Sequence, residues 1–156
     1  MTAKCSIDLE FIKRFWLDEI RPPLDKTLEL TPEDKLDWAP DEKMITLGNL
    51  FMHIAEASSW WIGKVMEHGE YFDLTPCPSL PKDQIKKLMD GHWYRLDDFF
   101  GRCPEVFEKT YPHTRRGQPV ELKGEWIMLH LLEHDIHHRS QINHYLRMLG
   151  IEPPKI

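Results

Sequence analysis

The chain has 156 residues, of which 41% are hydrophobic and 29% charged, an ordinary balance for a soluble globular domain. Its 20 lysines and arginines stand against 26 aspartates and glutamates, so the net charge is −6. This argues against a nucleic-acid partner or an acidic membrane surface, because either would need a basic face. No stretch reaches the roughly 20 apolar residues of a membrane span. We therefore predict a single domain over residues 1–156, without nucleic-acid or membrane partners.

The N-terminal sequence, MTAKCSIDLE, carries charges where a signal peptide would have its apolar core, which predicts a cytoplasmic protein. The three cysteines, Cys5, Cys77 and Cys103, are odd in number, and no two have CxxC spacing. We expect them to be free thiols in a reducing compartment, not disulfide partners or metal ligands.

A first helix is predicted from about residue 6 to residue 20. Ser6 is suited to cap it, because a serine side chain can accept from the free N–H groups of a first turn. Pro22 and Pro23 are expected to end or kink the helix, because proline lacks a backbone N–H. Helical spacing of leucines resumes after them and continues up to Thr31.

A second helix is predicted from about residue 45 to residue 68, because apolar residues recur there at steps of three and four. These residues are Leu47, Leu50, Ile54, Ala57, Trp61 and Val65. Gly69 is the expected stop, since glycine readily adopts the left-handed conformation that ends many helices. The proline-rich segment that follows must be a loop.

A third helix is predicted from about residue 81 to Gly101 and a fourth from about residue 122 to residue 149, where Gly150 closes it. The intervening segment, roughly residues 103–119, is expected to be a long loop, and no convincing strand pattern appears. We therefore predict an all-α four-helix bundle with long connections. Those connections leave the order of up and down helices open.

Five of the nine histidines lie in the predicted fourth helix. Successive residues of a helix are rotated by about 100°, so His134 and His138 fall at the inner border of the apolar stripe. His137 and His144 fall toward the outside. Only the first pair is placed to point imidazoles into the mouth of a bundle.

In the second helix, His53 lies on the border of the apolar stripe, between Leu50 and Ala57. An HxxxH pair supplies two metal ligands from adjacent helical turns, and a third histidine from a facing helix would complete a three-imidazole platform. Such a platform leaves one position open for water or substrate, which is typical of catalytic sites. Histidines with this spacing also occur on helix surfaces without metal, so the periodicity alone leaves both interpretations open.

Other polar residues are assigned simpler roles. His92 and His113 are expected to be exposed or in loops without a partner, and His68 to interact with the negative end of the second helix. A dinuclear site is disfavoured because only Asp135, three residues before His138, has the acid-x-x-His spacing that di-iron bundles use twice. Glu133 and Asp135 point away from His134 on the helical wheel. Glu56 or a backbone carbonyl is a candidate to orient a ligating imidazole.

Two segments, LDWAPDEKMITLGNLFMHIAE and HLLEHDIHHRSQINHYLRMLGIEPP, resemble the DinB-like (damage-inducible, YfiT-like) metalloenzymes. The resemblance covers most of the chain and implies a four-helix bundle, usually dimeric, that binds one nickel or zinc ion. By motif, the ligands fall on His53 in MHI and on His134 and His138 in EHDIHHR. Ser140 stands where the family commonly has glycine. His130 remains open as a substitute ligand or a supporting group.

Some members of this family are thiol transferases that use bacillithiol, mycothiol or glutathione. The first hypothesis is therefore a metal-dependent enzyme, such as a low-molecular-weight-thiol S-transferase or a hydrolase-like catalyst, with Glu56, His130 and Tyr145 as candidate general bases. The second is a non-catalytic metal-binding or stress-response homodimer. The third is a dimerisation module whose histidines bind no metal and whose tryptophans line the interface.

Overall fold

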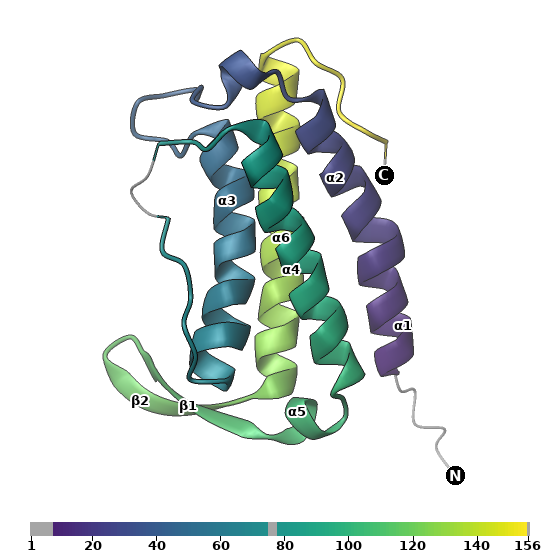
Figure 1. The fold of residues 1–156 in the computed structure, drawn as a ribbon, viewed down its shortest axis with the longest axis vertical. Coiled ribbons are helices and arrows are strands. Elements are labelled where there is room, and N and C mark those ends of the chain that lie inside the picture. Colours follow the sequence, from purple (N-terminus) through teal and green to yellow (C-terminus); the bar gives the residue numbers. More distant parts are fainter. Residues whose placement is uncertain (1–7, 75–77, 156) are drawn as a thin grey trace.

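The computed structural model describes residues 8–74 and 78–155. Cys5, Cys77 and the predicted cap Ser6 lie outside the described residues. The described chain is mostly helical, and Figure 1 shows its long helical segments lying side by side. No helix within this part of the chain combines the length and apolar character needed to cross a bilayer.

The first helical segment continues through both prolines. It consists of α1 (Leu9–Arg14), the π-helical turn η1 (Phe15–Ile20) and α2 (Arg21–Leu30). Asp8 caps α1 by accepting a hydrogen bond from the backbone N–H of Phe11. The Arg21 N–H donates to the carbonyl of Trp16, five residues earlier. This wider turn lets Pro22 enter the helix without the clash that a regular α-helical turn would impose.

The second segment also changes its winding. After a short turn, η2 (Glu33–Lys35), the helix α3 (Leu47–Ser58) passes into a π-helical stretch, η3 (Ser59–Met66). This helical segment ends at Met66, two residues before the end predicted at His68. His68 itself adopts the left-handed conformation, with φ of 55°, and the N–H of Gly69 donates to the carbonyl of Gly63. The left-handed residue after the helix is therefore His68, which is exposed, and not Gly69 as predicted.

The segment predicted as a long loop contains regular structure. The helix α4 (Lys82–Gly101) is followed by a short helix, α5 (Glu105–Glu108), and by a hairpin of β1 (Thr110–Arg115) and β2 (Gln118–Lys123). The antiparallel strands join through Arg116 and Gly117, both with positive φ, which is the pairing of a tight hairpin turn. The prediction of a chain without strands was therefore wrong here, although helices dominate.

The last helix, α6 (Gly124–Met148), starts where the hairpin ends. A side chain at Gly124 would collide with the backbone carbonyl of Val106 in α5, since a Cβ there would stand 1.9 Å from that oxygen. Glycine at this position lets α5 and the hairpin lie close against the start of α6. Figure 1 shows the hairpin crossing the end of the molecule where α6 begins and η3 ends.

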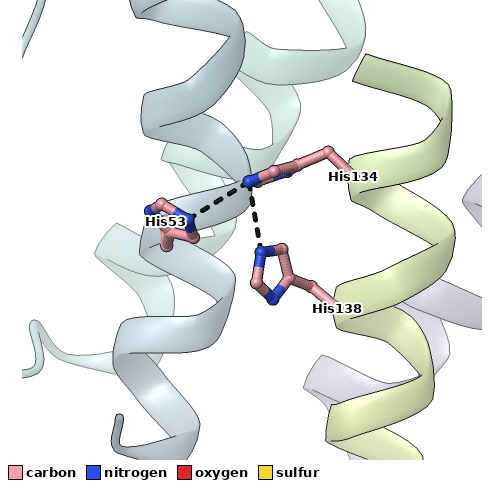
Figure 2. Close-up of side chains that lie close together, drawn as sticks. All are labelled: His53, His134 and His138. Carbon is pink, nitrogen blue, oxygen red and sulfur yellow. Dashed lines mark hydrogen bonds between the residues drawn. The ribbon is translucent and has the colours of Figure 1, made fainter. Parts of the chain in front are cut away.

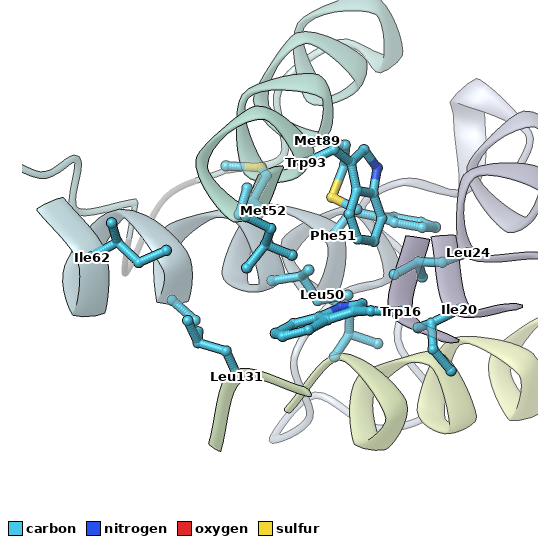
Figure 3. Close-up of a cluster of buried hydrophobic side chains, with 14 of the residues drawn as sticks. Trp16, Ile20, Leu24, Leu50, Phe51, Met52, Ile62, Met89, Trp93 and Leu131 are labelled. Carbon is cyan, nitrogen blue, oxygen red and sulfur yellow. The ribbon is translucent and has the colours of Figure 1, made fainter. Parts of the chain in front are cut away.

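The core fills the space between the helical segments. Each of them contributes large side chains that are almost completely buried, among them Trp16 from η1, Phe51 from α3, Trp93 from α4 and Leu131 from α6 (Figure 3). Helix α3 packs against both α4 and α6. This packing fixes the distance between His53 on α3 and the histidines of α6, on which the candidate site depends.

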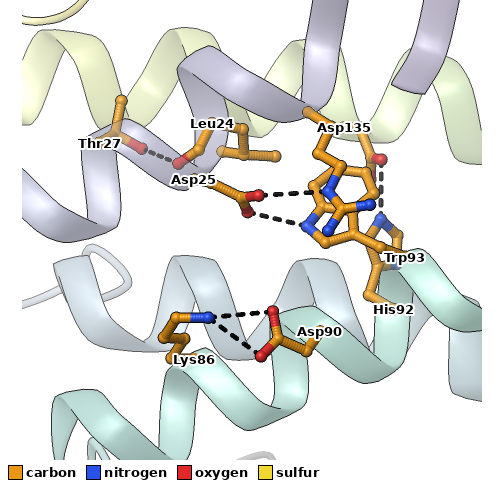
Figure 4. Close-up of polar contacts among 9 residues, drawn as sticks. Leu24, Asp25, Thr27, Lys86, Asp90, His92, Trp93 and Asp135 are labelled. Atoms are coloured by element: carbon orange, nitrogen blue, oxygen red, sulfur yellow. Dashed lines mark hydrogen bonds and ion pairs between the residues drawn. The ribbon is translucent and has the colours of Figure 1, made fainter. Parts of the chain in front are cut away.

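A polar cluster is buried within this core. The Asp135 side chain of α6 is fully buried, and its Oδ2 accepts from the Trp16 indole N–H. The same oxygen lies 2.8 Å from His92 Nε2 (Figure 4). His92, expected to be exposed or in a loop, is a buried residue of α4. That prediction was wrong, because a polar side chain can be buried when it has a matching partner, and this one lies 43 residues away.

Candidate metal centre

The structure brings together the three histidines that the sequence indicated. His53 projects from α3, and His134 and His138 project from adjacent turns of α6 (Figure 2). The Nε2 atom of His134 lies 3.1 Å from the Nε2 atoms of both His53 and His138. All three candidate ligand nitrogens lie within 4.8 Å of one another. Imidazoles from two helices therefore converge on one point.

Neighbouring side chains set the orientation of two of these imidazoles, those of His138 and His53. The Nδ1 of His138 lies 2.6 Å from Gln141 Oε1, and the Nδ1 of His53 lies 3.5 Å from Glu56 Oε2. An acceptor at Nδ1 favours a proton there, which leaves a lone pair on Nε2. His134 Nδ1 is buried and has no hydrogen-bond partner among the described residues. Glu56 is a sequence-based candidate for this orienting role, and its position beside His53 fits the role.

The two nitrogen spacings at His134 fit a first-row metal ion. For metal–nitrogen bonds of about 2.0–2.1 Å, two ligands at 90° lie about 2.9 Å apart and two tetrahedral ligands about 3.3 Å apart. The spacing of 3.1 Å from His134 to each neighbour lies between these values. Three neutral imidazoles suit zinc, nickel, copper or iron. The donor set thus fits one divalent ion and leaves part of its coordination sphere without a protein ligand.

Burial holds two of the imidazoles in the neutral form that a metal requires. It lowers the pKa of His134 to about 2, with further lowering by the neighbouring His138 and His53. Burial also lowers the pKa of His138 to about 4, although the hydrogen bond with Gln141 opposes this. At neutral pH, neither His134 nor His138 must lose a proton before it can bind a metal ion.

These shifts predict how the metal-free protein responds to acid. An unfolded histidine has a pKa of about 6.5. Between pH 6.5 and about 4, the unfolded chain therefore binds protons at His134 and His138 that the folded chain does not. As the pH is lowered through this range, the free energy of unfolding should decrease by up to about 1.4 kcal/mol per pH unit for each histidine. Urea denaturation with a chelator, at pH 7, 6 and 5, should show a smaller pH slope for His134→Gln than for the wild type.

The exposed His144 provides the control for this experiment. Its Nδ1 lies 2.7 Å from the carbonyl of Ser140, away from the three-histidine cluster. His144→Gln should keep the wild-type dependence of stability on pH. Equal slopes in His134→Gln and the wild type would contradict the role assigned to the buried imidazole.

The site opens into a cavity of about 580 Å³. Two of the three histidines, His53 and His134, form part of its wall. The other lining residues are Glu56, Ala57, Trp60, Trp61, Tyr71, Asp73 and His130. The π-helical stretch η3 carries both tryptophans, and π-helical turns are frequent at functional sites. A small molecule in this cavity would touch two of the candidate metal ligands.

His130 lies in the cavity wall but outside the cluster of three. Its ring stacks on Trp126, with centroids 5.0 Å apart, and packs edge-on against Trp61 at 5.3 Å. Burial lowers the pKa of His130, and the nearby Glu133 partly opposes this. Its position among aromatic rings favours a supporting role over that of a substitute ligand. His113, expected in a loop, lies in β1 and contacts Trp61 at 4.9 Å.

Several residues of the cavity were not predicted from the sequence. Trp60 was considered only as an interface residue, and Tyr71 and Asp73 fell in a segment read as a plain loop. Regular helical periodicity could not predict that Trp60 and Trp61 both face the cavity, because a π-helical turn changes which side chains share a face. Tyr145, a candidate base, is buried and donates to the carbonyl of Ile45. It is not among the residues that line the cavity.

Comparisons with known proteins agree with this fold. The structure is similar to a DinB-like protein of Bacillus subtilis (YjoA), with a TM-score of 0.70 and 16% identity over 92% of this chain and 96% of that one. It is also similar to a DinB-like protein of Bacillus cereus ATCC 10987, with a TM-score of 0.69 and 18% identity over 95% and 97% of the two chains. No curated protein matches the sequence. The model of the DinB family matches residues 14–156, and the chain therefore belongs to the DinB family.

Proposed function

We propose that this protein is a metal-dependent enzyme that acts on a small molecule, with a low-molecular-weight thiol as the favoured substrate. The observation that carries the proposal is the placement of His53 and His134 at the wall of an open cavity, with His138 beside them. A structural metal site is typically closed by four protein ligands, whereas a catalytic site keeps a position open. Within the described residues, the cluster offers three ligands.

Different residues around this cavity would bind the metal ion, orient its ligands and accept a proton. A bound zinc or nickel ion would act as a Lewis acid and lower the pKa of a thiol or water held there. Glu56 keeps the His53 ring in position through its Nδ1. Glu56 and His130 both line the cavity, so they are the groups placed to accept a proton from a substrate. The aromatic rings exclude water from the substrate's apolar part.

We also propose an architecture, an oligomeric state and a cellular compartment for the protein. The packed helices are interpreted as a four-helix bundle, and the active form as a cytoplasmic homodimer with one ion per chain. Exposed apolar side chains at the start of the first helical segment, among them Phe11 of α1 and Phe15 of η1, are available for such contacts. Size-exclusion chromatography with light scattering measures the subunit number directly.

Turnover should depend on the metal site. Zinc- or nickel-loaded protein is assayed with glutathione, bacillithiol and cysteine as thiols and 1-chloro-2,4-dinitrobenzene as electrophile. A chelator, or the substitution His138→Ala, is expected to lower kcat/KM by about 100-fold or more, because Lewis-acid activation contributes several kcal/mol. His144→Ala serves as the control and should retain the wild-type rate. Metal binding without turnover for any thiol or electrophile would instead favour a non-catalytic metal-binding protein.

A further inference from the structure

The chain that leaves η3 supplies part of the cavity wall. Figure 1 shows this chain running back beside α3. We name residues 71–74 the return segment, and two of them, Tyr71 and Asp73, line the cavity. The return segment is neither helix nor strand. The contacts that it makes with neighbouring elements therefore decide where its two lining side chains lie.

Three contacts hold the return segment against the helices. The Phe72 N–H donates to the Ser59 hydroxyl oxygen of η3 at 3.3 Å. The guanidinium of Arg95, from α4, lies over the Phe72 ring, 5.5 Å from its centroid. The Tyr71 ring packs edge-on against Trp60, with centroids 4.6 Å apart. None of these three contacts involves a histidine of the metal centre.

Glu56 makes a fourth contact, and this one reaches the three-histidine cluster. Its Oε1 accepts from the Leu74 N–H at 3.3 Å, and its Oε2 lies 3.5 Å from His53 Nδ1. The Glu56 side chain is only 14% exposed, so water competes weakly for either oxygen. The carboxylate therefore joins a candidate metal ligand to the backbone of the return segment.

Both partners of this carboxylate are hydrogen-bond donors when the metal centre is loaded. The Leu74 N–H is always a donor. His53 that binds a metal ion through Nε2 carries its proton on Nδ1, so this nitrogen donates as well. Two donors at two separate oxygens require a carboxylate, because a carboxamide offers one oxygen and one donor group. In the metal-free protein the His53 proton can occupy either nitrogen, so the contact with Glu56 is not fixed.

We propose that Glu56 is a positioning residue that couples occupancy of the metal centre to the order of the cavity wall. The inference rests on the proposed function, which places a metal ion at the three histidines and the substrate in the cavity beside them. With its Nε2 engaged, His53 donates through Nδ1 to Glu56, whose other oxygen then holds the Leu74 N–H. The metal-loaded protein therefore presents a better-ordered substrate wall at Tyr71 and Asp73 than the metal-free protein.

Amide hydrogen exchange of the full-length protein, measured by NMR with and without saturating zinc, tests this coupling. Zinc is expected to slow exchange of the Leu74 N–H by at least about fivefold, the lower end of the coupling between two linked sites. In Glu56→Gln the effect of zinc should fall below about twofold, because one amide oxygen cannot serve both donors. Saturation is checked by titration, since loss of a group that supports a ligand lowers metal affinity by about 10- to 100-fold.

The chain offers a matched variant and a matched amide as controls. Glu70→Gln makes the same chemical change at an exposed residue next to the return segment, and it should keep the full effect of zinc on Leu74. The Ser79 N–H donates to the Asp37 carboxylate at 3.1 Å, a bond of the same kind outside the cluster. Its exchange should not respond to zinc. Thermal melting confirms that each variant is folded.

A purely structural role for Glu56 predicts a different pattern. Leu74 would then exchange faster in Glu56→Gln by the same factor with and without zinc, and that result overturns the proposal. A wild type in which zinc slows Leu74 no more than Ser79 overturns it as well. This second comparison needs no variant, so it holds even if Glu56→Gln does not fold.

The same data separate this inference from the proposed function. A zinc effect on Leu74 in a wild type without turnover would count against the enzyme proposal alone. Metal-dependent turnover with no zinc effect on Leu74 would count against the coupling alone. A protein that binds no zinc would contradict both.

Discussion

Replacing Asp135 with alanine is expected to lower the free energy of unfolding by about 3–5 kcal/mol, because it breaks a buried network by removing one partner. The carboxylate is fully buried and accepts from Trp16 Nε1, with His92 Nε2 also at 2.8 Å. Its loss would leave both of those nitrogens buried without their acceptor. Urea denaturation monitored by circular dichroism measures the change.

Asp90→Ala is the matched control for this substitution. The Asp90 carboxylate pairs with Lys86 on the exposed surface of α4, where such pairs contribute about 0.2–1 kcal/mol. A double-mutant cycle of Asp135→Ala with His92→Ala then isolates the coupling between the two side chains. A loss below about 1 kcal/mol for Asp135→Ala would show that burial of this carboxylate is compensated in some other way.

Metal binding is expected to stabilise the folded chain, because the unfolded chain does not hold three imidazoles together. At a free ion concentration 100 times the dissociation constant, the gain is about 2.7 kcal/mol. For a domain of this size, each kcal/mol raises the melting temperature by about 2–4 °C. Zinc or nickel should therefore raise the Tm by about 5–11 °C in differential scanning calorimetry.

The same experiment with single histidine variants locates the effect. His53→Ala removes the one ligand that α3 supplies, so the Tm shift on adding metal should fall to less than half. His137→Ala removes an exposed histidine next to His138 in the sequence and should keep the full shift. If the ion stabilised His53→Ala as much as the wild type, it would be bound elsewhere.

Helical periodicity placed the candidate histidines at the borders of apolar stripes, and the resemblance to a family was needed to choose them as metal ligands. An imidazole at the border of an apolar stripe is carried to the mouth of the core when the stripe is buried, and His53, His134 and His138 lie at such borders. The pairing of α3 with α6 is not encoded in either helix alone. It depends on the shape of the whole core, which the resemblance to a family supplied and the structure then showed.

The features that were missed depend on long-range contacts or on changes in backbone winding. His92 and Asp135 lie on different helices, and only packing brings their side chains together. The π-helical stretch η3 breaks the regular period that places Trp60 on a face. Prolines at positions 112 and 119 concealed the hairpin, since proline is uncommon within strands. Tyr71 and Asp73 lie in an irregular segment, for which periodicity carries no information.

Elemental analysis of untagged protein, purified without chelators, measures whether the three histidines hold a metal ion. The wild type and His134→Ala are compared, because His134 Nε2 is the atom that lies 3.1 Å from both other histidines. We expect about one zinc or nickel ion per chain in the wild type, and its loss in the variant. A wild type that holds no metal, even after incubation with either ion, would contradict the assignment of this cluster as a metal centre.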